Sequence, residues 1–253
     1  MESFVTVFNT LYIPQGLALY RSMERHIDNY ELWIICVDDE CHNVLSKMNL
    51  SNVKLIKLSS VETKDLLRVK KDRSMSEYCW TLTPFSHRFV FEADKTINRV
   101  TYLDADMWFL KSPMDIFNKF NISKKNVLIT EHAYAPEYDQ THLSGKYCVQ
   151  FLTFTRNGEH IRKWWEEKCI EWCYAIHDNG RFGDQKYLDD WDLKFAKDVF
   201  IFPYLSYFQA PWNASIFDHS EAHLYHFHQT KIKITMSKFD RLLKIGSYDI
   251  PPI

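Results

Sequence analysis

Hydrophobic and polar positions in the first half of the chain alternate between two patterns. Short apolar runs, typical of buried strands, occupy residues 4–8, 32–37, 53–58 and 99–103. The segments between them carry apolar residues at helical spacing, and we expect helices from Pro14, over 40–48 and from Pro84 to about Ala93. Strands that alternate with helices predict an α/β fold in which helices flank a mostly parallel sheet.

The first predicted helix has one apolar and one polar face. Tyr20 and Met23 recur at the spacing of a buried face. Ser22 and Arg25 fall on the opposite face, which we expect to meet water. Residues 59–79 are polar and show no clear periodicity, so we expect a solvated loop there.

The second half of the chain is less regular, with strands expected at 127–130, 149–154 and 199–202. The clearest helix is expected from Asn157, as its cap, to about His177. It carries tryptophan, cysteine and isoleucine at helical spacing, a stripe more typical of a packed core than of a ligand platform. No internal repeat or linker divides the chain, so we expect a single domain.

Composition excludes several function classes. The chain has 253 residues with 31 Lys and Arg against 33 Asp and Glu, a net charge of −2, and therefore lacks the basic excess of nucleic-acid-binding proteins. Only six glycines occur, and their positions permit neither a G-x-G-x-x-G fingerprint nor a G-x-x-x-x-G-K-[ST] phosphate loop. A bound phosphate must be held in another way.

Neither a membrane span nor a secretion signal is expected. The longest apolar stretch, at 32–37, is far shorter than the roughly 18 residues that a span requires. The start of the chain lacks the basic and long apolar regions of a signal peptide. The six cysteines form no C-x-x-C pair, and we expect reduced structural thiols in a cytoplasmic protein.

The strongest chemical signal is Asp104-Ala105-Asp106, which directly follows the strand predicted at 99–103. In open α/β sheets, ligands bind at the carboxyl edge of the strands. Alternate residues that leave a strand can direct two carboxylates at one Mg²⁺ or Mn²⁺ ion, whose shell is completed by water and substrate phosphates. The alternative is a pair of turn aspartates that cap the following segment.

Residues 100–110 and 112–117 together resemble the D-x-D signature of GT-A glycosyltransferases, and most closely that of family 8, which includes glycogenin and lipopolysaccharide galactosyltransferases. The resemblance implies a Rossmann-like GT-A domain over residues 1–235. Its nucleotide-binding half would cover 1–110 and its acceptor and sugar half 111–235.

Further stretches that match the family in order imply the remaining site residues. The implied nucleotide-binding residues are Phe8, Asn9, Thr10 and Tyr12 from the first strand and helix, Ala105 of the D-x-D, and Lys231 or Lys233 at the diphosphate. The segment Tyr225-His226-Phe227 resembles the family's metal-binding histidine, so the implied metal ligands are Asp104, Asp106 and His226. The implied catalytic residues are Asp184 and Gln185 at the donor sugar, and Arg88 near the donor phosphates and sugar.

Some of these positions depart from the family or have another interpretation. Cys148, Val149 and Gln150 stand where family members usually read Asn-Ala-Gly. The two C-terminal lysines fall five and seven residues after His226 instead of six, which leaves the choice between them open. On a regular strand His228 shares a face with His226, whereas residue 223 does not.

Two further candidates have plain structural alternatives. Asp184 could merely cap the helix expected at 185–190, and Arg88 could be a surface residue of its helix. In the same way, the two lysines could form a solvated edge. Position in the sequence does not separate these roles from the ones that the family resemblance implies.

The resemblance implies metal-dependent transfer of a sugar, with retention, from a nucleotide-diphosphate sugar to a glycan or lipid-linked acceptor. Mn²⁺ or Mg²⁺ is the implied cofactor, uridine diphosphate the usual carrier, and bacterial surface-polysaccharide or lipopolysaccharide synthesis the implied setting. Two other classes stay open: a glycan- or nucleotide-binding module with a retained metal site, and a D-x-D phosphatase of the haloacid-dehalogenase kind. Turnover of a nucleotide sugar distinguishes transfer from both.

Positive charge is locally concentrated over residues 231–244, where five basic residues face one acid, and we expect 236–253 to be a basic amphipathic segment. A short helix with one apolar and one basic face is predicted from the spacing of Met236, Phe239, Leu242 and Leu243 among lysines and an arginine. Such a face either packs on the catalytic domain or makes a peripheral contact with anionic lipid at the inner face of a membrane.

Overall fold

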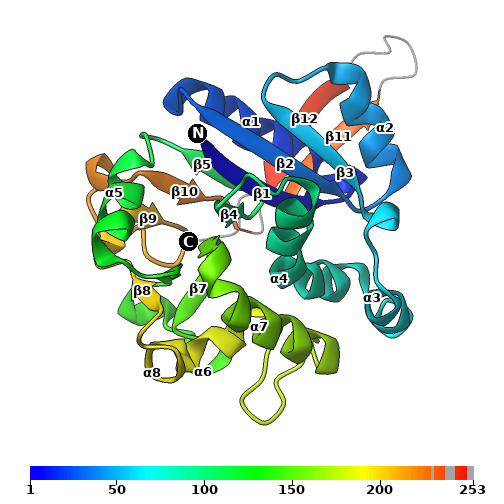
Figure 1. Cartoon of the computed structure of the whole chain (residues 1–253). Helices are drawn as coiled ribbons and strands as arrows, with labels where there is room; N and C mark the ends of the chain where they lie inside the picture. The colour runs from blue at the N-terminus through cyan, green and yellow to red at the C-terminus, as the bar shows by residue number, and fades with distance from the viewer. Residues whose placement is uncertain (229–230, 237–242, 250–253) are drawn as a thin grey trace.

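A seven-stranded sheet forms the centre of the molecule (Figure 1). The computed structural model describes residues 1–228 and the backbone of 231–236 and 243–249. The strand order is β3-β2-β1-β4-β7-β6-β8; β7 is antiparallel to both of its neighbours, and the other pairs are parallel. The strands are β1 (Glu2–Phe8), β2 (Tyr30–Cys36), β3 (Val53–Lys57), β4 (Arg99–Leu103), β6 (Val127–Glu131), β7 (Tyr147–Thr155) and β8 (Val199–Ile201). The predicted α/β fold with a mostly parallel sheet is confirmed.

Helices cover both faces of this sheet, each over its own apolar core. One core lies under α1 (Ile13–His26), α2 (Asp39–Met48) and α5 (Met114–Ser123). The other lies under α3 (Lys64–Val69), α4 (Met75–Ala93) and α7 (Glu159–Glu171), and α4 and α7 pack side by side (Figure 1). The shorter helices are α6 (Thr141–Ser144) and α8 (Trp191–Lys194), with 3₁₀ turns η1 (Thr10–Tyr12) and η5 (Gln185–Asp190).

A small three-stranded sheet adjoins the end of β4. It consists of β5 (Met107–Phe109), β10 (Leu224–His226) and β9 (Phe208–Gln209) in that order. Because β5 starts directly after the D-x-D segment and pairs with β10, residues more than a hundred positions apart in the sequence meet at the carboxyl edge of the main sheet.

Ser22 lies on the buried side of α1, contrary to the expectation that it faces water. Its hydroxyl donates to the Leu19 carbonyl at 2.7 Å and accepts from the backbone N–H of Phe109 at 3.0 Å. The expectation failed because a hydroxyl can be buried without cost when both of its hydrogen bonds are satisfied. Arg25 is exposed as expected. Ser22 thereby fixes β5, and so the strand that follows the D-x-D, against α1.

The loop expected at 59–79 is wrong, because it contains α3 and the first turn of α4. Helix α4 begins at Met75 instead of Pro84, behind a capping box formed by Ser74 and Glu77. The Ser-x-x-Glu spacing is a known start signal that hydrophobic periodicity does not register. Pro84 lies inside the helix and is buried.

The helix expected to run to His177 is shorter. Helix α7 ends at Glu171, where Trp172 adopts an extended conformation, and it starts after Gly158 instead of Asn157. The expected periodicity nevertheless marks real burial for Trp165, which lies fully in the core. Beyond Glu171 the apolar spacing continues along an irregular segment, where Cys173 is buried but Ile176 is exposed. Periodicity alone does not distinguish such a segment from a helix.

The basic C-terminal helix is not found where the structure describes the backbone. Strands β11 (Lys231–Met236) and β12 (Leu243–Asp249) form an antiparallel pair, in which Met236 is opposite Leu243. The remaining residues of the expected helix, 237–242, lie outside the described residues. Met236 and Leu243, the ends of the predicted helix, instead lie opposite each other in this strand pair.

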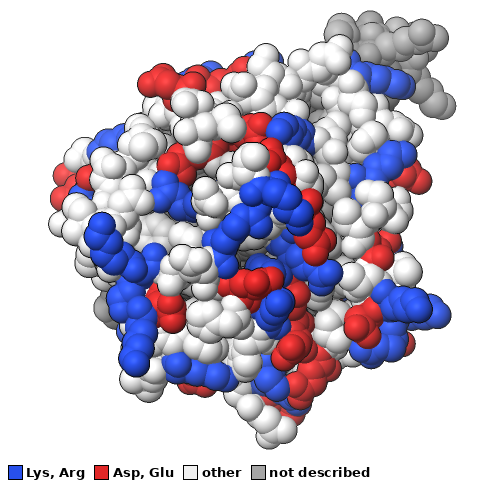
Figure 2. All heavy atoms as spheres, viewed as in Figure 1, with Lys and Arg blue, Asp and Glu red and all other residues white. Residues whose placement is uncertain are grey.

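Basic and acidic side chains are interspersed over the face shown in Figure 2, as the near-zero net charge leads one to expect. Over the described ranges 1–228, 231–236 and 243–249, none of the helices is long and apolar enough to cross a membrane. The six cysteines are free thiols.

We predict that Ser22→Ala lowers the free energy of unfolding by about 1–3 kcal/mol, because it leaves the buried N–H of Phe109 without an acceptor. Chemical denaturation followed by circular dichroism measures the change. Ser60→Ala is the matched control, since it removes an exposed hydroxyl bonded to the Lys57 carbonyl and should shift stability by no more than about 0.5 kcal/mol. Equal effects of the two substitutions would contradict a role for Ser22 in fixing β5.

Candidate metal and donor site

Asp104 and Asp106 leave the carboxyl end of β4 in a tight turn. The turn is closed by a hydrogen bond from the Met107 N–H to the Asp104 carbonyl at 3.2 Å. The Tyr102 hydroxyl donates to Asp104 Oδ1 at 2.9 Å. The partner strand β10 then brings in His226, which lies opposite Met107 and whose neighbour Phe227 donates its N–H to the Asp106 carbonyl.

These three side chains converge on one point. His226 Nε2 lies 3.1 Å from Asp106 Oδ1 and 3.6 Å from Asp104 Oδ2, and one ligand atom from each residue falls within 4.8 Å of the others. The His226 side chain is 4% exposed, whereas Asp104 and Asp106 are 24% and 14% exposed. The imidazole thus forms the floor of the group, and the two carboxylates form its open rim.

The pKa values of the three groups record an excess of negative charge. Burial and the neighbouring charge of Asp106 raise the pKa of Asp104, against the opposing influence of His226. Burial opposes a charge on His226, but Asp106 outweighs burial and holds the pKa of His226 well above its usual range. Burial acts to raise the pKa of Asp106, yet the charge of His226 lowers it overall. Two adjacent carboxylates with one shared cationic partner favour a further positive charge.

This donor set fits a divalent cation. Carboxylate oxygens are typical ligands of Mg²⁺ and Mn²⁺, and an imidazole nitrogen can bind Mn²⁺ and other transition metals. Three protein ligands on one side leave room for phosphate or water on the open rim. The simple capping alternative for Asp104 and Asp106 does not account for a histidine brought to them from residue 226.

Of the three histidines near β10, the structure selects His226. His223 faces another direction: its Nδ1 lies 3.1 Å from the Ser112 carbonyl, and its ring stacks on Tyr207. The ring of His228 lies 5.4 Å from that of His226 but is not one of the three grouped ligands. The choice that the strand pattern left open between 226 and 228 is thereby decided in favour of 226.

Asp184 is buried near enough to Asp104 to be influenced by its charge, and one oxygen of its carboxylate lacks a hydrogen-bond partner among the described residues. Its Oδ2 accepts no hydrogen bond from the part of the chain that the structure describes, and its side chain makes no capping bond to η5. Burial is the main influence that raises the pKa of Asp184 to about 7; the Thr83 hydroxyl opposes it, and the charge of Asp104 adds to it. The capping alternative for Asp184 therefore has no support in the hydrogen bonds of η5, and the role of this residue at a donor sugar stays a prediction.

Tyr12 is the residue of the first turn that faces the same space. Its phenol is partly exposed, and after burial the charges of Asp106 and Asp104 are the main influences that raise its pKa. Thr10 uses both its N–H and its hydroxyl to bind Asp38. Asn9 caps η1 through the N–H of Leu11.

Two residues assigned to the nucleotide are core side chains instead. The Phe8 ring is buried against Gly16, where a β-carbon would meet the ring at 2.5 Å, so the side chain is not available to a ligand. Ala105 is buried with the core beneath the D-x-D turn. The alternation of the strand directs Phe8 into the packed face of the sheet.

Arg88 does not join the site. It pairs with Glu92 at 2.8 Å and lies 3.8 Å from Glu166 on α7, so it belongs to the contact between α4 and α7. Gln185 lies next to Asp184, and its amide donates to the Ser144 carbonyl at 3.0 Å. Lys231 and Lys233 lie on β11, where only the backbone is described.

Two contacts that support the metal group, those of Gln150 and Tyr102, were not predicted from the sequence. Gln150 of β7 accepts a hydrogen bond from His226 Nδ1 through its Oε1, and the Tyr102 hydroxyl donates to Asp104. Gln150 was noted only as a departure from the family pattern, and nothing in the sequence placed it beside a residue 76 positions later. The sequence did contain a weak indication for Tyr102: it precedes Asp104 by two residues, so on a regular strand the two side chains lie on the same face.

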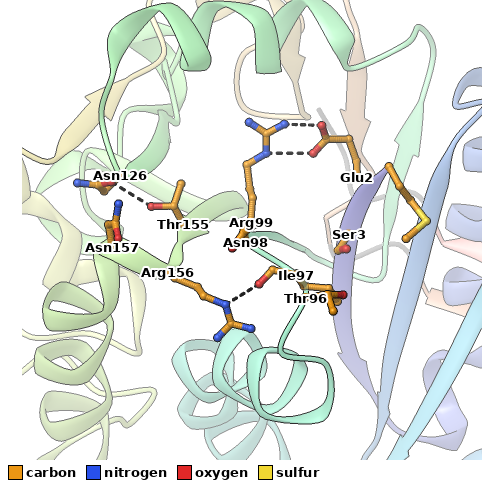
Figure 3. Close-up of a pocket in the computed structure, with 11 residues that line it drawn as sticks. Glu2, Ser3, Thr96, Ile97, Asn98, Arg99, Asn126, Thr155, Arg156 and Asn157 are labelled. Atoms are coloured by element: carbon orange, nitrogen blue, oxygen red, sulfur yellow. Dashed lines mark hydrogen bonds and ion pairs between the residues drawn. The ribbon is translucent and has the colours of Figure 1, made fainter.

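A separate hollow of about 650 Å³ lies at the opposite edge of the sheet (Figure 3). The hollow lies among the amino ends of β1 and β4 and the carboxyl end of β7. Its arginines already have partners, since Arg99 pairs with Glu2 and Arg156 donates to the Ile97 carbonyl. Convergent unsatisfied groups lie instead at the carboxyl edge, which we therefore take as the functional site.

Comparison with known proteins gives two sequence relatives. No family model matches the chain. It is 31% identical over 197 residues to the uncharacterized protein YfnF of Bacillus subtilis (strain 168), covering 74% of this chain and 64% of YfnF. It is 28% identical over 218 residues to the uncharacterized protein YfnD of the same organism, covering 83% of this chain and 68% of YfnD. The chain thus spans about two thirds of the length of these relatives.

Solved structures similar to this one are glycosyltransferases. Mouse xyloside xylosyltransferase 1 aligns with a TM-score of 0.57 and 12% identity over 90% of this chain and 98% of that chain. The galactosyltransferase LgtC aligns with a TM-score of 0.58 and 11% identity over 89% of this chain and 87% of that chain. GlyE of Streptococcus pneumoniae TIGR4 aligns with a TM-score of 0.57 and 15% identity over 96% of this chain and 58% of that chain. The fold is that of GT-A glycosyltransferases, as the sequence motifs implied.

We predict that His226→Ala weakens the binding of Mn²⁺ at least about tenfold, because it removes the only nitrogen ligand of the described group. Calorimetry with Mn²⁺, alone and with uridine diphosphate, measures the affinity. His223→Ala is the matched control and should bind as the unsubstituted protein does. Loss of binding in the control but not in His226→Ala would move the metal group elsewhere.

Proposed function

We propose that the protein is a metal-dependent glycosyltransferase that uses a nucleotide-diphosphate sugar. The observation that carries the proposal is the convergence of Asp104, Asp106 and His226 at the carboxyl edge of a sheet whose fold is shared with glycosyltransferases. In such sheets this edge is the ligand-binding edge. The absence of a glycine-rich phosphate loop from the sequence agrees with a diphosphate held through a cation.

Sugar transfer places growing negative charge on the leaving diphosphate while the anomeric carbon gains oxocarbenium character. A cation held by Asp104, Asp106 and His226 would neutralise that charge when it is bound. The two carboxylates form the open rim of the group, so phosphate oxygens approach from that side. Lys231 or Lys233 would add a fixed positive charge at the diphosphate.

Asp184 and Gln185 are proposed to hold the donor sugar. Asp184 has an unpartnered carboxylate oxygen that can accept a hydrogen bond from a sugar hydroxyl. Gln185 follows it directly on η5 and is tied to the Ser144 backbone, which limits where its amide can point. Tyr12, partly exposed and facing the two aspartates, is proposed to contact the nucleoside.

We further propose uridine diphosphate as the carrier, Mn²⁺ or Mg²⁺ as the cation and a glycan or lipid-linked acceptor, in the synthesis of surface polysaccharide or lipopolysaccharide. Retention of configuration is proposed by analogy with family 8. Peripheral contact of the basic C-terminal segment with the inner face of a membrane remains part of the proposal. Its support is the cluster of lysines and one arginine after residue 230.

A binding module with the same metal group is the second candidate. It would bind the nucleotide with the cation but show no turnover. The D-x-D phosphatase has less support, because the similar solved structures are glycosyltransferases. Slow hydrolysis of a nucleotide sugar in the absence of acceptor separates the enzyme from the binding module, and phosphate-monoester hydrolysis identifies a phosphatase.

We predict Mn²⁺-dependent hydrolysis of at least one nucleotide sugar in a screen of uridine and guanosine diphosphate sugars. The rate is measured as released nucleoside diphosphate. Asp106→Asn should lower this rate roughly 10²-fold or more, because one hard ligand is lost while the fold is kept. Asp65→Asn, an exposed aspartate of α3, is the control and should retain the rate.

Tight nucleotide binding with no turnover of any sugar in the screen would favour the binding module. A rate in Asp106→Asn equal to that of the control would contradict the metal-assisted mechanism, whichever sugar is used.

A further inference from the structure

Strand β7 delivers one side chain to the back of the metal group. Because β7 is antiparallel to β4, with Leu103 opposite Phe151, the amino half of β7 lies at the functional edge of the sheet. The Asp104 N–H donates to the Gln150 carbonyl at 3.2 Å, which places Gln150 across from the first aspartate. The Gln150 side chain is buried and points to His226 instead of to solvent.

The contact between the two side chains is a single short hydrogen bond. His226 Nδ1 lies 2.8 Å from Gln150 Oε1. An amide oxygen can only accept, so the proton of this bond is on Nδ1. The ring then directs Nε2 at Asp106 Oδ1 and Asp104 Oδ2, and a metal-binding histidine needs its lone pair on that nitrogen.

The ring is also held from the side. Trp212 meets the His226 ring edge to face, with centroids 5.4 Å apart. Cys148, on the same face of β7 as Gln150, is a further neighbour and contributes to the raised pKa of His226. Neither contact selects which ring nitrogen carries the proton. Among the described neighbours, Gln150 supplies the acceptor that makes this selection.

Gln150 is one of the positions at which this chain departs from the family that it resembles. At position 150 the resembling family usually has glycine, which has no side chain to reach the histidine. The sequence alone gave the departure from the family pattern at 148–150 no role. One of these residues, Gln150, now proves to bind His226, the third residue of the metal group.

We propose that Gln150 is a positioning residue that fixes the ring orientation and tautomer of His226 and thereby sets the cation affinity of the site. The inference rests on the proposed metal group and adds to it a determinant outside the three ligands. Loss of a second-shell partner of this kind usually weakens metal binding by about 10–100-fold.

The test is a titration of Mn²⁺, alone and with uridine diphosphate, followed by the electron paramagnetic resonance signal of free Mn²⁺. Gln150→Met keeps the length of the side chain but removes the acceptor oxygen, and we expect it to weaken binding about 10–100-fold. Gln150→Glu keeps an acceptor oxygen and should restore affinity to within about threefold of the unsubstituted protein. Gln150→Leu replaces the methionine variant if that protein does not fold.

Gln209→Met is the matched control. Gln209 is also buried, and its Oε1 also lies 2.8 Å from a histidine Nδ1, that of His219, which does not belong to the metal group. We expect its affinity for Mn²⁺ to be unchanged. In the Gln150→Met variant, raised Mn²⁺ should recover the rate of donor hydrolysis, because only the occupancy of the site is lowered.

The outcomes separate the two proposals. If the unsubstituted protein binds Mn²⁺ and His226→Ala does not, but Gln150→Met binds normally, the metal site stands and the role of Gln150 is overturned. Equal weakening in Gln150→Met and Gln150→Glu also overturns it, since shape and not the acceptor oxygen would then matter. Failure of the unsubstituted protein to bind Mn²⁺ overturns both the metal site and this inference.

Discussion

The carboxylates of Asp104 and Asp106 are like charges held close together at one end of β4, and the surrounding structure is arranged around that unfavourable proximity. A single imidazole, itself buried, is the partner that the described residues provide for both. Two anions and one shared cation leave negative charge uncompensated. Burial first, and then the charge of Asp106, raise the pKa of Asp104 against the influence of His226. Such a group is stable in this form only because the fold fixes it, and it becomes favourable when a divalent cation completes it.

Three separate parts of the fold keep this group in place. The main sheet supplies the strand end, and the carboxyl edge lies clear of both helical layers that bury its faces. Helix α1 binds the end of β5 through Ser22, which accepts from the Phe109 N–H, so the chain after the D-x-D has one direction. The pairing of β5 with β10 then sets His226 opposite Met107. The site is therefore assembled from segments far apart in sequence, and its precision depends on long-range contacts.

Local patterns in the sequence were enough for most strands and for the D-x-D turn, because apolar runs and a pair of acids after a strand are local signals. They failed for α4, whose capping box precedes the apolar run, and for α7, whose apolar spacing continues past its end. Phe8 and Arg88 were assigned from the family's order of motifs, but packing directs one into the core and the other to α7. Gln150 depends on the register of β7 against β4, which no local pattern contains.

Anomalous diffraction at the manganese absorption edge, from crystals grown with MnCl₂ and uridine diphosphate, locates the cation directly. We predict one strong peak within bonding distance of Asp104, Asp106 and His226 Nε2, with the diphosphate on its open side and the Gln150 oxygen still on His226 Nδ1. A manganese peak at another place, with these three side chains unliganded beside bound nucleotide, would contradict the assignment of the site and the metal-assisted transfer that follows from it.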